Sequence, residues 1–142
     1  MEKISVVIPV YNEEQSISEG YAELSSILQR MGNPYELIYV DDGSRDATLE
    51  KLKVIASQDA ALKVIELRRN FGQTAAMAAG LENTTGDIVI TLDGDLQNDP
   101  AEIPRMVARL REGYDMVAGW RKFRKDPFVN RKLPSMIANW VI

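Results

Sequence analysis

The amino-acid sequence alternates between short, continuous apolar runs and longer stretches in which apolar residues recur every three or four positions. An apolar run without polar alternation is typical of a strand that is covered on both faces, as in a parallel sheet. The chain has 142 residues and is 45% hydrophobic, which suffices for one domain with a substantial core. Five apolar runs predict strands, at 3–9, 36–41, 62–67, 87–92 and 114–119.

The stretches between these runs predict helices. Residues 14–31 carry an apolar stripe at helical spacing, and Ser44 or Asp46 can cap a helix that continues to about residue 58. Residues 73–83 are alanine-rich, and residues 100–112 begin with a proline, which the first turn of a helix accepts. Strands that alternate with helices predict an α/β fold with an open, mostly parallel sheet and helices on both faces.

The final ten residues, LPSMIANWVI, also carry an apolar pattern of helical type. Met136, Ile137, Trp140 and Val141 lie on one helical stripe, and no cap or stop signal follows them. We therefore expect a helix here and a chain that is part of a larger protein. The alternative is a C-terminal helix packed on the core.

Polar residues cluster directly after each predicted strand. In chain order the clusters read YNEE, DDGSRD, RRNFGQ, DGDLQND and WRKFRKD. The carboxyl ends of parallel strands lie at one edge of a sheet, and the ligands of open α/β folds bind there. We therefore expect these five loops to converge on one ligand-binding crevice.

Composition narrows the chemistry of such a site. The chain contains neither cysteine nor histidine, which excludes thiolate catalysis, disulfides and a histidine general base. A bound metal would need oxygen ligands, as magnesium, manganese and calcium prefer. Charge is unevenly distributed, because residues 119–142 hold six basic residues and one acidic residue in a chain of net charge −4. This pattern indicates an acidic body with a basic edge.

The fourth polar cluster is the best candidate for a metal site. Asp93, Asp95 and Gln97 offer two carboxylates and an amide oxygen after a strand, which suits a hard divalent ion that also binds a diphosphate. An acidic capping turn is the alternative, because Asp and Asn are common in turns. An EF-hand calcium loop is excluded, because Asn98 and Pro104 stand where that loop needs Gly and Glu. The glycine-rich fingerprints of dinucleotide-binding and P-loop proteins do not occur either.

Four segments together resemble a known family. VVIPVYNEE, VDDGSRDAT, NFGQTAAMAAGL and TLDGDLQNDPAEIP, in this order and spacing, resemble family 2 glycosyltransferases with the GT-A fold. The resemblance is closer to the polyprenyl-phosphate branch, which includes dolichol-phosphate mannosyltransferase and the undecaprenyl-phosphate sugar transferases. It covers essentially the whole chain. It implies a nucleotide-sugar-binding GT-A core at 1–120 and the start of an acceptor-binding, membrane-proximal segment at 121–142.

The resemblance implies a nucleotide site. The residues matched to it are Pro9, Tyr11 and Glu13 in the pocket, Val40 and Asp42 at the base, and Asp93 and Gly94 along the ribose and diphosphate. Independently of the family, Asp42 can accept a hydrogen bond from uracil or guanine, and Tyr11 offers a stacking face. Tyr11 can instead simply pack, and Glu13 can be an acid favoured by a helix N-terminus.

The resemblance also implies a metal site and an acceptor site. Asp95 is the main ligand of Mg²⁺ or Mn²⁺, assisted by Asp93 and Gln97. Arg121, Arg131 and Ser135 match positions that hold the acceptor's lipid phosphate, and arginine suits bidentate phosphate binding. Asp95, Arg121 and Arg131 are the predicted catalytic residues. No general base is assigned, with Asp99 and Asp126 as candidates.

The predicted activity is metal-dependent, inverting transfer of a sugar from a UDP- or GDP-sugar to a polyprenyl phosphate. A family 2 enzyme that elongates a polysaccharide, and a donor-binding fragment without activity of its own, are the alternatives. The basic segment favours an anionic membrane surface over nucleic acid, because aromatic residues are not interleaved as stacking platforms. We expect a soluble cytoplasmic portion of a protein that works at the cytoplasmic face of a membrane.

Overall fold

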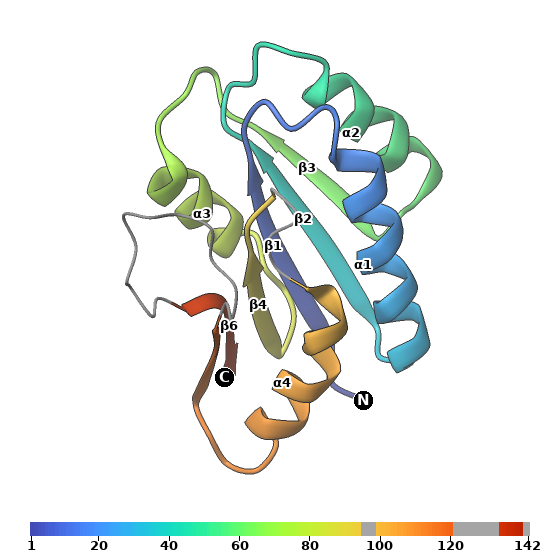
Figure 1. Cartoon of the computed structure of the whole chain (residues 1–142), viewed down its shortest axis with the longest axis vertical. Coiled ribbons are helices and arrows are strands. Elements are labelled where there is room, and N and C mark those ends of the chain that lie inside the picture. The colour runs from blue at the N-terminus through green and yellow to red at the C-terminus, as the bar shows by residue number, and fades with distance from the viewer. Residues whose placement is uncertain (95–98, 121–133, 141–142) are drawn as a thin grey trace.

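A computed structural model describes residues 1–94, 99–120 and 134–140 of the chain (Figure 1). The five predicted strands and four predicted helices are confirmed to within a few residues. The elements in chain order are β1 (Ile4–Val10), α1 (Ile17–Met31), β2 (Tyr35–Asp41), α2 (Thr48–Gln58), β3 (Leu62–Glu66), α3 (Gln73–Glu82), β4 (Ile88–Leu92), the short 3-10 helix η1 (Pro100–Glu102), α4 (Ile103–Leu110), β5 (Met116–Trp120) and β6 (Pro134–Trp140).

The strands form one sheet in the order β3-β2-β1-β4-β6-β5. The first four strands of this order are parallel, whereas β6 runs antiparallel to both β4 and β5. Strand order reverses at the centre, because β2 and β3 lie on one side of β1 and β4 lies on the other. We call the edge where the parallel strands end the carboxyl edge, and the opposite edge the amino edge.

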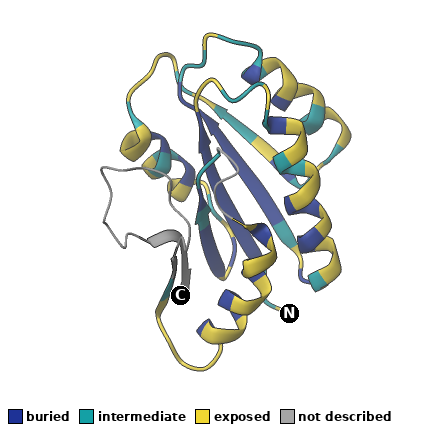
Figure 2. Cartoon of the chain, in the orientation of Figure 1, coloured by how far each residue is buried: buried dark blue, intermediate teal, exposed yellow. Residues whose placement is uncertain are grey.

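Helices cover both faces of the sheet (Figure 1). On one face, α1, α2 and α4 pack on alternate residues of the strands in the larger apolar cluster, which includes Val6, Leu37 and Ile90. On the other face, α3 packs on the intervening residues, which include Val7, Ile38 and Val89. The central strands β1, β2 and β4 are therefore buried on both sides while the helices keep an exposed face, as Figure 2 shows.

Small residues let α3 approach the sheet closely. A Cβ atom at Gly80 would lie 2.3 Å from a methyl carbon of Val7, which is too close for a side chain. Ala76 of the same helix is completely buried. The alanine-rich composition that predicted this helix therefore also brings it close to the sheet, with its first turn at the carboxyl edge.

The expectation of a helix at the end of the chain is wrong. Residues Pro134–Trp140 form β6, which lies between β4 and β5, with Met136 opposite Leu92 and Trp140 opposite Ile88. Both neighbours supply backbone hydrogen-bond partners that local periodicity cannot reveal. The division of the chain at residue 120 stays a prediction, although β6 belongs to the same sheet as the core strands.

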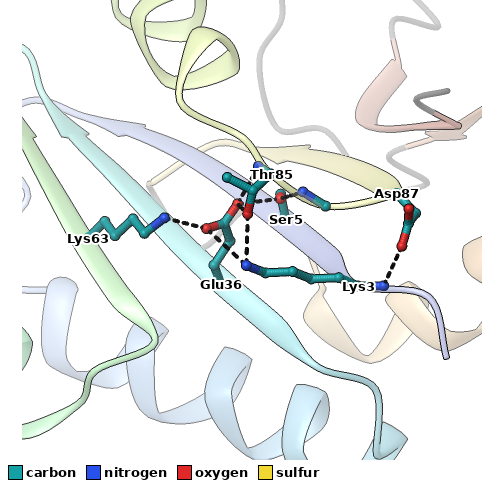
Figure 3. Close-up of polar contacts among 7 residues, drawn as sticks. Lys3, Ser5, Glu36, Lys63, Thr85 and Asp87 are labelled. Atoms are coloured by element: carbon teal, nitrogen blue, oxygen red, sulfur yellow. Dashed lines mark hydrogen bonds and ion pairs between the residues drawn. The ribbon is translucent and has the colours of Figure 1, made fainter.

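A buried carboxylate ties strands together at the amino edge (Figure 3). Glu36 is only 2% exposed, yet it accepts hydrogen bonds from the Ser5 hydroxyl, the Lys63 ammonium and both the amide and hydroxyl of Thr85. Burial alone would raise the pKa of Glu36, but these donors lower it from 4.5 to about 2. Lys3 adds a second cation at 3.6 Å. The Glu36 charge is therefore neutralised within the fold.

Candidate active site

The loops after β1 and β2 are joined by reciprocal hydrogen bonds at the carboxyl edge. The Asn12 amide donates to the Ser44 hydroxyl at 2.9 Å, and the Arg45 amide donates to the Asn12 side-chain oxygen at 2.9 Å. Asn12 adopts a positive φ of 52°, a conformation that asparagine tolerates better than most residues. The Glu13 amide also donates to the Thr48 hydroxyl at 2.8 Å. The predicted convergence of the first two polar clusters is therefore confirmed.

The two acids at the end of β2 have separate roles. Asp41 accepts a hydrogen bond from the Ser44 amide at 3.3 Å, as a turn-capping residue does, while its other carboxylate oxygen is buried without a hydrogen-bond partner. Asp42 accepts hydrogen bonds from the amides of Phe71 and Gly72 at 2.8 and 3.1 Å. Asp42 is 4% exposed, so it anchors the loop after β3 onto the end of β2.

The end of β4 lies against the end of β1. A Cβ atom at Gly94 would stand 2.5 Å from a methyl carbon of Val10 and 3.0 Å from the carbonyl oxygen of Pro9. Only glycine therefore fits between the two strands without a shift. Beside it, the Gln73 side-chain amide donates to Asp93 at 2.9 Å, which links the start of α3 to the acidic end of β4.

The predicted nucleotide residues differ in accessibility. Tyr11 is 39% exposed at the carboxyl edge, whereas Pro9 is buried. The Val40 side chain is fully buried in the apolar cluster under α3, so a contact with a base would involve its backbone only. Glu13 lies before the first turn of α1 and accepts a hydrogen bond from the Ser16 hydroxyl at 3.0 Å. Their nucleotide-binding roles stay predictions.

Hydrogen bonds favour negative charge in this part of the site. Burial would raise the pKa of Asp46, but the Thr48 hydroxyl, the Thr48 amide and the Glu14 amide donate to it and lower its pKa. Among the ion pairs of residues 1–94 and 99–118, none involves Asp41 or Asp42. Asp41 and Asp42 therefore have neutral hydrogen-bond donors as their described partners.

Most of the predicted metal and acceptor residues fall outside the described part of the chain. Asp95, Gln97, Arg121, Arg131 and the candidate base Asp126 belong to this group, and Ser135 is described only as a backbone position in β6. Asp99, the other candidate base, accepts a hydrogen bond from the Ala101 amide at 3.0 Å and caps η1.

The described residues fit one part of a divalent-metal site. Residues 1–94 and 99–118 hold no group of three acidic side chains placed to bind a metal ion. Of the three predicted metal ligands, Asp93 lies within the described residues. Its carboxylate stands at the end of β4 next to Gly94, where the backbone after β4 comes close to the backbone of β1. With no histidine or cysteine in the chain, an oxygen-only donor set suits a hard cation.

Sequence reasoning overlooked several residues that hold the loops together. Thr48 and Gln73, the first residues of α2 and α3, had no assigned role, and neither did Asn12, although each makes a hydrogen bond to a loop distant in sequence. The useful signal was their position, because Asn12 and Gln73 belong to polar clusters that follow apolar strands and Thr48 stands two residues after such a cluster. Their partners come from other loops, 20 to 35 residues away in sequence.

Comparison with solved structures identifies the class of the fold. The structure of glucosyl-3-phosphoglycerate synthase from Mycobacterium tuberculosis in complex with Mn²⁺, UDP and phosphoglyceric acid is similar, with a TM-score of 0.72 and 25% sequence identity. The similarity covers 98% of this chain and 56% of that protein. The sheet and its helices are therefore those of the GT-A glycosyltransferases, as the sequence predicted.

Sequence comparison then gives the family. Residues 5–141 match the sequence model of glycosyl transferase family 2, and the chain belongs to that family. A dodecaprenyl-phosphate galacturonate synthase of Rhizobium johnstonii is 47% identical over 99% of this chain. An undecaprenyl-phosphate 4-deoxy-4-formamido-L-arabinose transferase of Pseudomonas paraeruginosa is 46% identical over 98% of it. The chain spans 42% and 41% of these two relatives.

No helix in the described ranges is both long and apolar enough to cross a membrane.

Proposed function

We propose that this chain forms the donor-binding and catalytic part of an inverting glycosyltransferase. The enzyme moves a sugar from a nucleoside diphosphate sugar to a polyprenyl phosphate. One observation carries the proposal: the loops after β1, β2 and β3 and the start of the loop after β4 are bonded or packed together at the point where strand order reverses. Relatives with 46–47% identity are named for transfer to dodecaprenyl or undecaprenyl phosphate.

The donor is a UDP- or GDP-sugar. Tyr11 provides an exposed ring for the base, and Asp42 lies next to it in space because its amide donates to the Val10 carbonyl at 2.9 Å. Pro9, Glu13 and Val40 complete the base side of the pocket. Asp93 and Gly94 lie along the ribose and the diphosphate, where the absence of a side chain at Gly94 lets this segment lie directly against β1.

Asp93, Asp95 and Gln97 hold a divalent cation, Mg²⁺ or Mn²⁺. When bound, the cation binds the diphosphate and stabilises the charge that develops as the nucleotide leaves. The related synthase of Mycobacterium tuberculosis was crystallised with Mn²⁺ and UDP, which supports this choice of metal.

The transfer step exchanges one carbon–oxygen bond for another. An oxygen of the acceptor phosphate attacks the anomeric carbon from the face opposite the diphosphate, and the bond to the nucleotide breaks with inversion. A phosphate monoester has a second pKa of about 6, so this oxygen is ionised at neutral pH and needs no general base. Arg121 and Arg131, with Ser135, hold the acceptor phosphate in line for attack.

The acceptor's lipid chain places the reaction at the cytoplasmic face of a membrane. The basic segment within 119–132 is attracted to anionic headgroups, with each lysine or arginine contributing about 1 kcal/mol near the surface.

Calorimetric titration of the full chain with UDP and with GDP, with and without Mn²⁺, tests the donor site. We expect Asp95→Ala to abolish Mn²⁺-dependent nucleotide binding. Asp115→Ala, a change at an exposed acid before β5, should leave it intact. Unchanged Mn²⁺-supported affinity in the Asp95 variant would contradict the proposed metal site.

An acceptor assay separates lipid transfer from polysaccharide elongation. We expect transfer to a polyprenyl phosphate and none to an oligosaccharide, and a large loss of transfer in Arg131→Ala. Activity on the oligosaccharide alone, with Arg131→Ala harmless, would refute the lipid acceptor. Nucleotide binding without transfer to either acceptor would indicate a donor-binding unit that is inactive by itself.

A further inference from the structure

The loop between β3 and α3 presents an aromatic ring to solvent at the carboxyl edge. Phe71 is 50% exposed, and the Arg69 guanidinium lies 4.7 Å from the centre of its ring. A cation over one face of a ring is attracted to its π electrons and restricts its orientation. The proposed function assigns neither residue a role. The exposed half of the Phe71 side chain gains nothing from burial, so packing does not explain it.

The backbone that carries Phe71 is fixed from the side of β2. Both oxygens of Asp42 accept amide hydrogen bonds, from Phe71 and from Gly72. The turn after β2 also lies directly against the loop, because a Cβ atom at Gly43 would stand 2.3 Å from the carbonyl carbon of Arg69. Phe71 is therefore held beside the acid that the proposed function places at the base.

The same loop is fixed from the side of β4 as well. Gln73 follows directly on Phe71 and Gly72, and its side-chain amide donates to Asp93 at 2.9 Å. The loop thus crosses from the end of β2 to the end of β4, over the position where strand order reverses. A loop held at both ends is preorganised, so a ligand that stacks on its ring need not order the loop first.

We propose that Phe71 is a second aromatic contact for the base of the donor nucleotide, with Arg69 orienting its ring. This inference rests on the proposed function and adds a residue that determines donor affinity. Tyr11 and Phe71 are both exposed, and both lie next to Asp42. The Asp42 amide donates to the carbonyl of Val10, the residue before Tyr11. The Phe71 amide donates to the Asp42 carboxylate. A planar base stacks on such faces and leaves its edge to the carboxylate.

Phe71→Ala in the full chain tests the inference, with Tyr114→Ala as the matched control. Tyr114 is also 50% exposed, and Arg109 lies 5.0 Å from its ring centre, but it stands in the turn before β5. The probes are UDP, GDP and inorganic diphosphate, each titrated with Mn²⁺. We expect Phe71→Ala to lower the affinity for both nucleotides about tenfold, as the loss of one base–aromatic stack does. Affinity for diphosphate should not change, Phe71→Trp should restore nucleotide affinity, and Tyr114→Ala should match the wild type.

Three results would overturn the inference. Equal weakening of nucleotide and diphosphate would mean that Phe71 only supports the loop. Unchanged nucleotide affinity, with a raised KM for polyprenyl phosphate, would assign the ring to the acceptor's lipid chain. An unchanged nucleotide affinity together with an unchanged KM for polyprenyl phosphate would show that the ring has no role in either site. Failure of the wild-type chain to bind either nucleotide would instead refute the proposed function, and the inference with it.

Discussion

Two buried acids, Glu36 near the start of β2 and Asp42 directly after its end, lie at opposite edges of the sheet. They are six residues apart in the sequence, which is about 20 Å along a strand. Glu36, at the amino edge, is 2% exposed and is bonded to the Lys63 ammonium at 2.6 Å. Asp42, at the carboxyl edge, is 4% exposed and receives two backbone amides. The two carboxylates are thus similarly buried but differ in their partners, which are a lysine for Glu36 and backbone amides for Asp42.

That difference separates an acid that stabilises the fold from an acid suited to a ligand. Glu36 is neutralised by lysines and has hydroxyl and amide donors besides, so its charge is satisfied within the chain. Among the described residues, Asp42 has backbone amides and no cation as partners, so a ligand at the carboxyl edge can supply a further hydrogen-bond donor. Removing Glu36 should therefore affect folding alone, and removing Asp42 should affect both folding and binding.

The largest effect is expected from Glu36→Ala. The change leaves Lys63 and the donors of Ser5 and Thr85 without their acceptor, and each buried donor left unsatisfied costs about 1–3 kcal/mol. Chemical denaturation measures this loss. The control is Glu66→Ala, which removes an exposed pair with Lys53 at 3.8 Å and should cost less than about 1 kcal/mol. Similar losses in both variants would show that burial at the amino edge is unimportant.

The second prediction concerns pH. Because the pKa of Glu36 is lowered to about 2 in the folded chain, its ionised form stabilises the fold above the unfolded value of 4.5. We expect wild type to exceed Glu36→Gln in unfolding free energy by about 3 kcal/mol at neutral pH, from the shift at about 1.36 kcal/mol per pKa unit. The advantage should shrink as pH falls from about 4.5 towards 2. A difference that stayed constant over that range would contradict it.

A smaller loss of stability, with a loss of binding, is expected from Asp42→Asn. Asparagine presents one acceptor oxygen where two amides donate, so one donor loses its partner, at about 1–2 kcal/mol. Nucleotide affinity should fall at least tenfold, because the base loses a charged acceptor. Denaturation and calorimetry on the same samples measure both effects. Wild-type nucleotide affinity in a destabilised Asp42→Asn variant would show that Asp42 only fixes the loop after β3 and does not contribute to binding.

The smallest effect is expected from Gln73→Ala. Its hydrogen bond to Asp93 is exposed, so stability should change by less than about 1 kcal/mol. Without this donor Asp93 is less constrained, and the Mn²⁺ concentration that half-saturates nucleotide binding should rise a few-fold. Gln73→Glu, which places a like charge beside Asp93, should raise it further. A Mn²⁺ requirement equal to that of the wild type in both variants would show that Gln73 does not position Asp93.

Much of the site's framework followed from the sequence, but its contacts did not. Polar clusters after apolar runs placed the loops of Tyr11, Asp42 and Asp93 at one edge, because parallel strands end on the same side. The roles of Phe71 and Gln73 could not be predicted, because their partners come from loops distant in sequence. The predicted ligands Asp95 and Gln97 lie outside the described residues and stay predictions.

The sequence by itself determined the parallel half of the sheet and its helices, because continuous apolar runs, helical stripes and turn residues are local signals that agree with one another. Only the tertiary structure decided the conformation of Pro134–Trp140 and the partners of Glu36. A short apolar run is compatible with a helix or a strand, and β6 forms where β4 and β5 both offer hydrogen-bond partners. Glu36 likewise became a structural acid only when folding brought Lys63 and Thr85 to it.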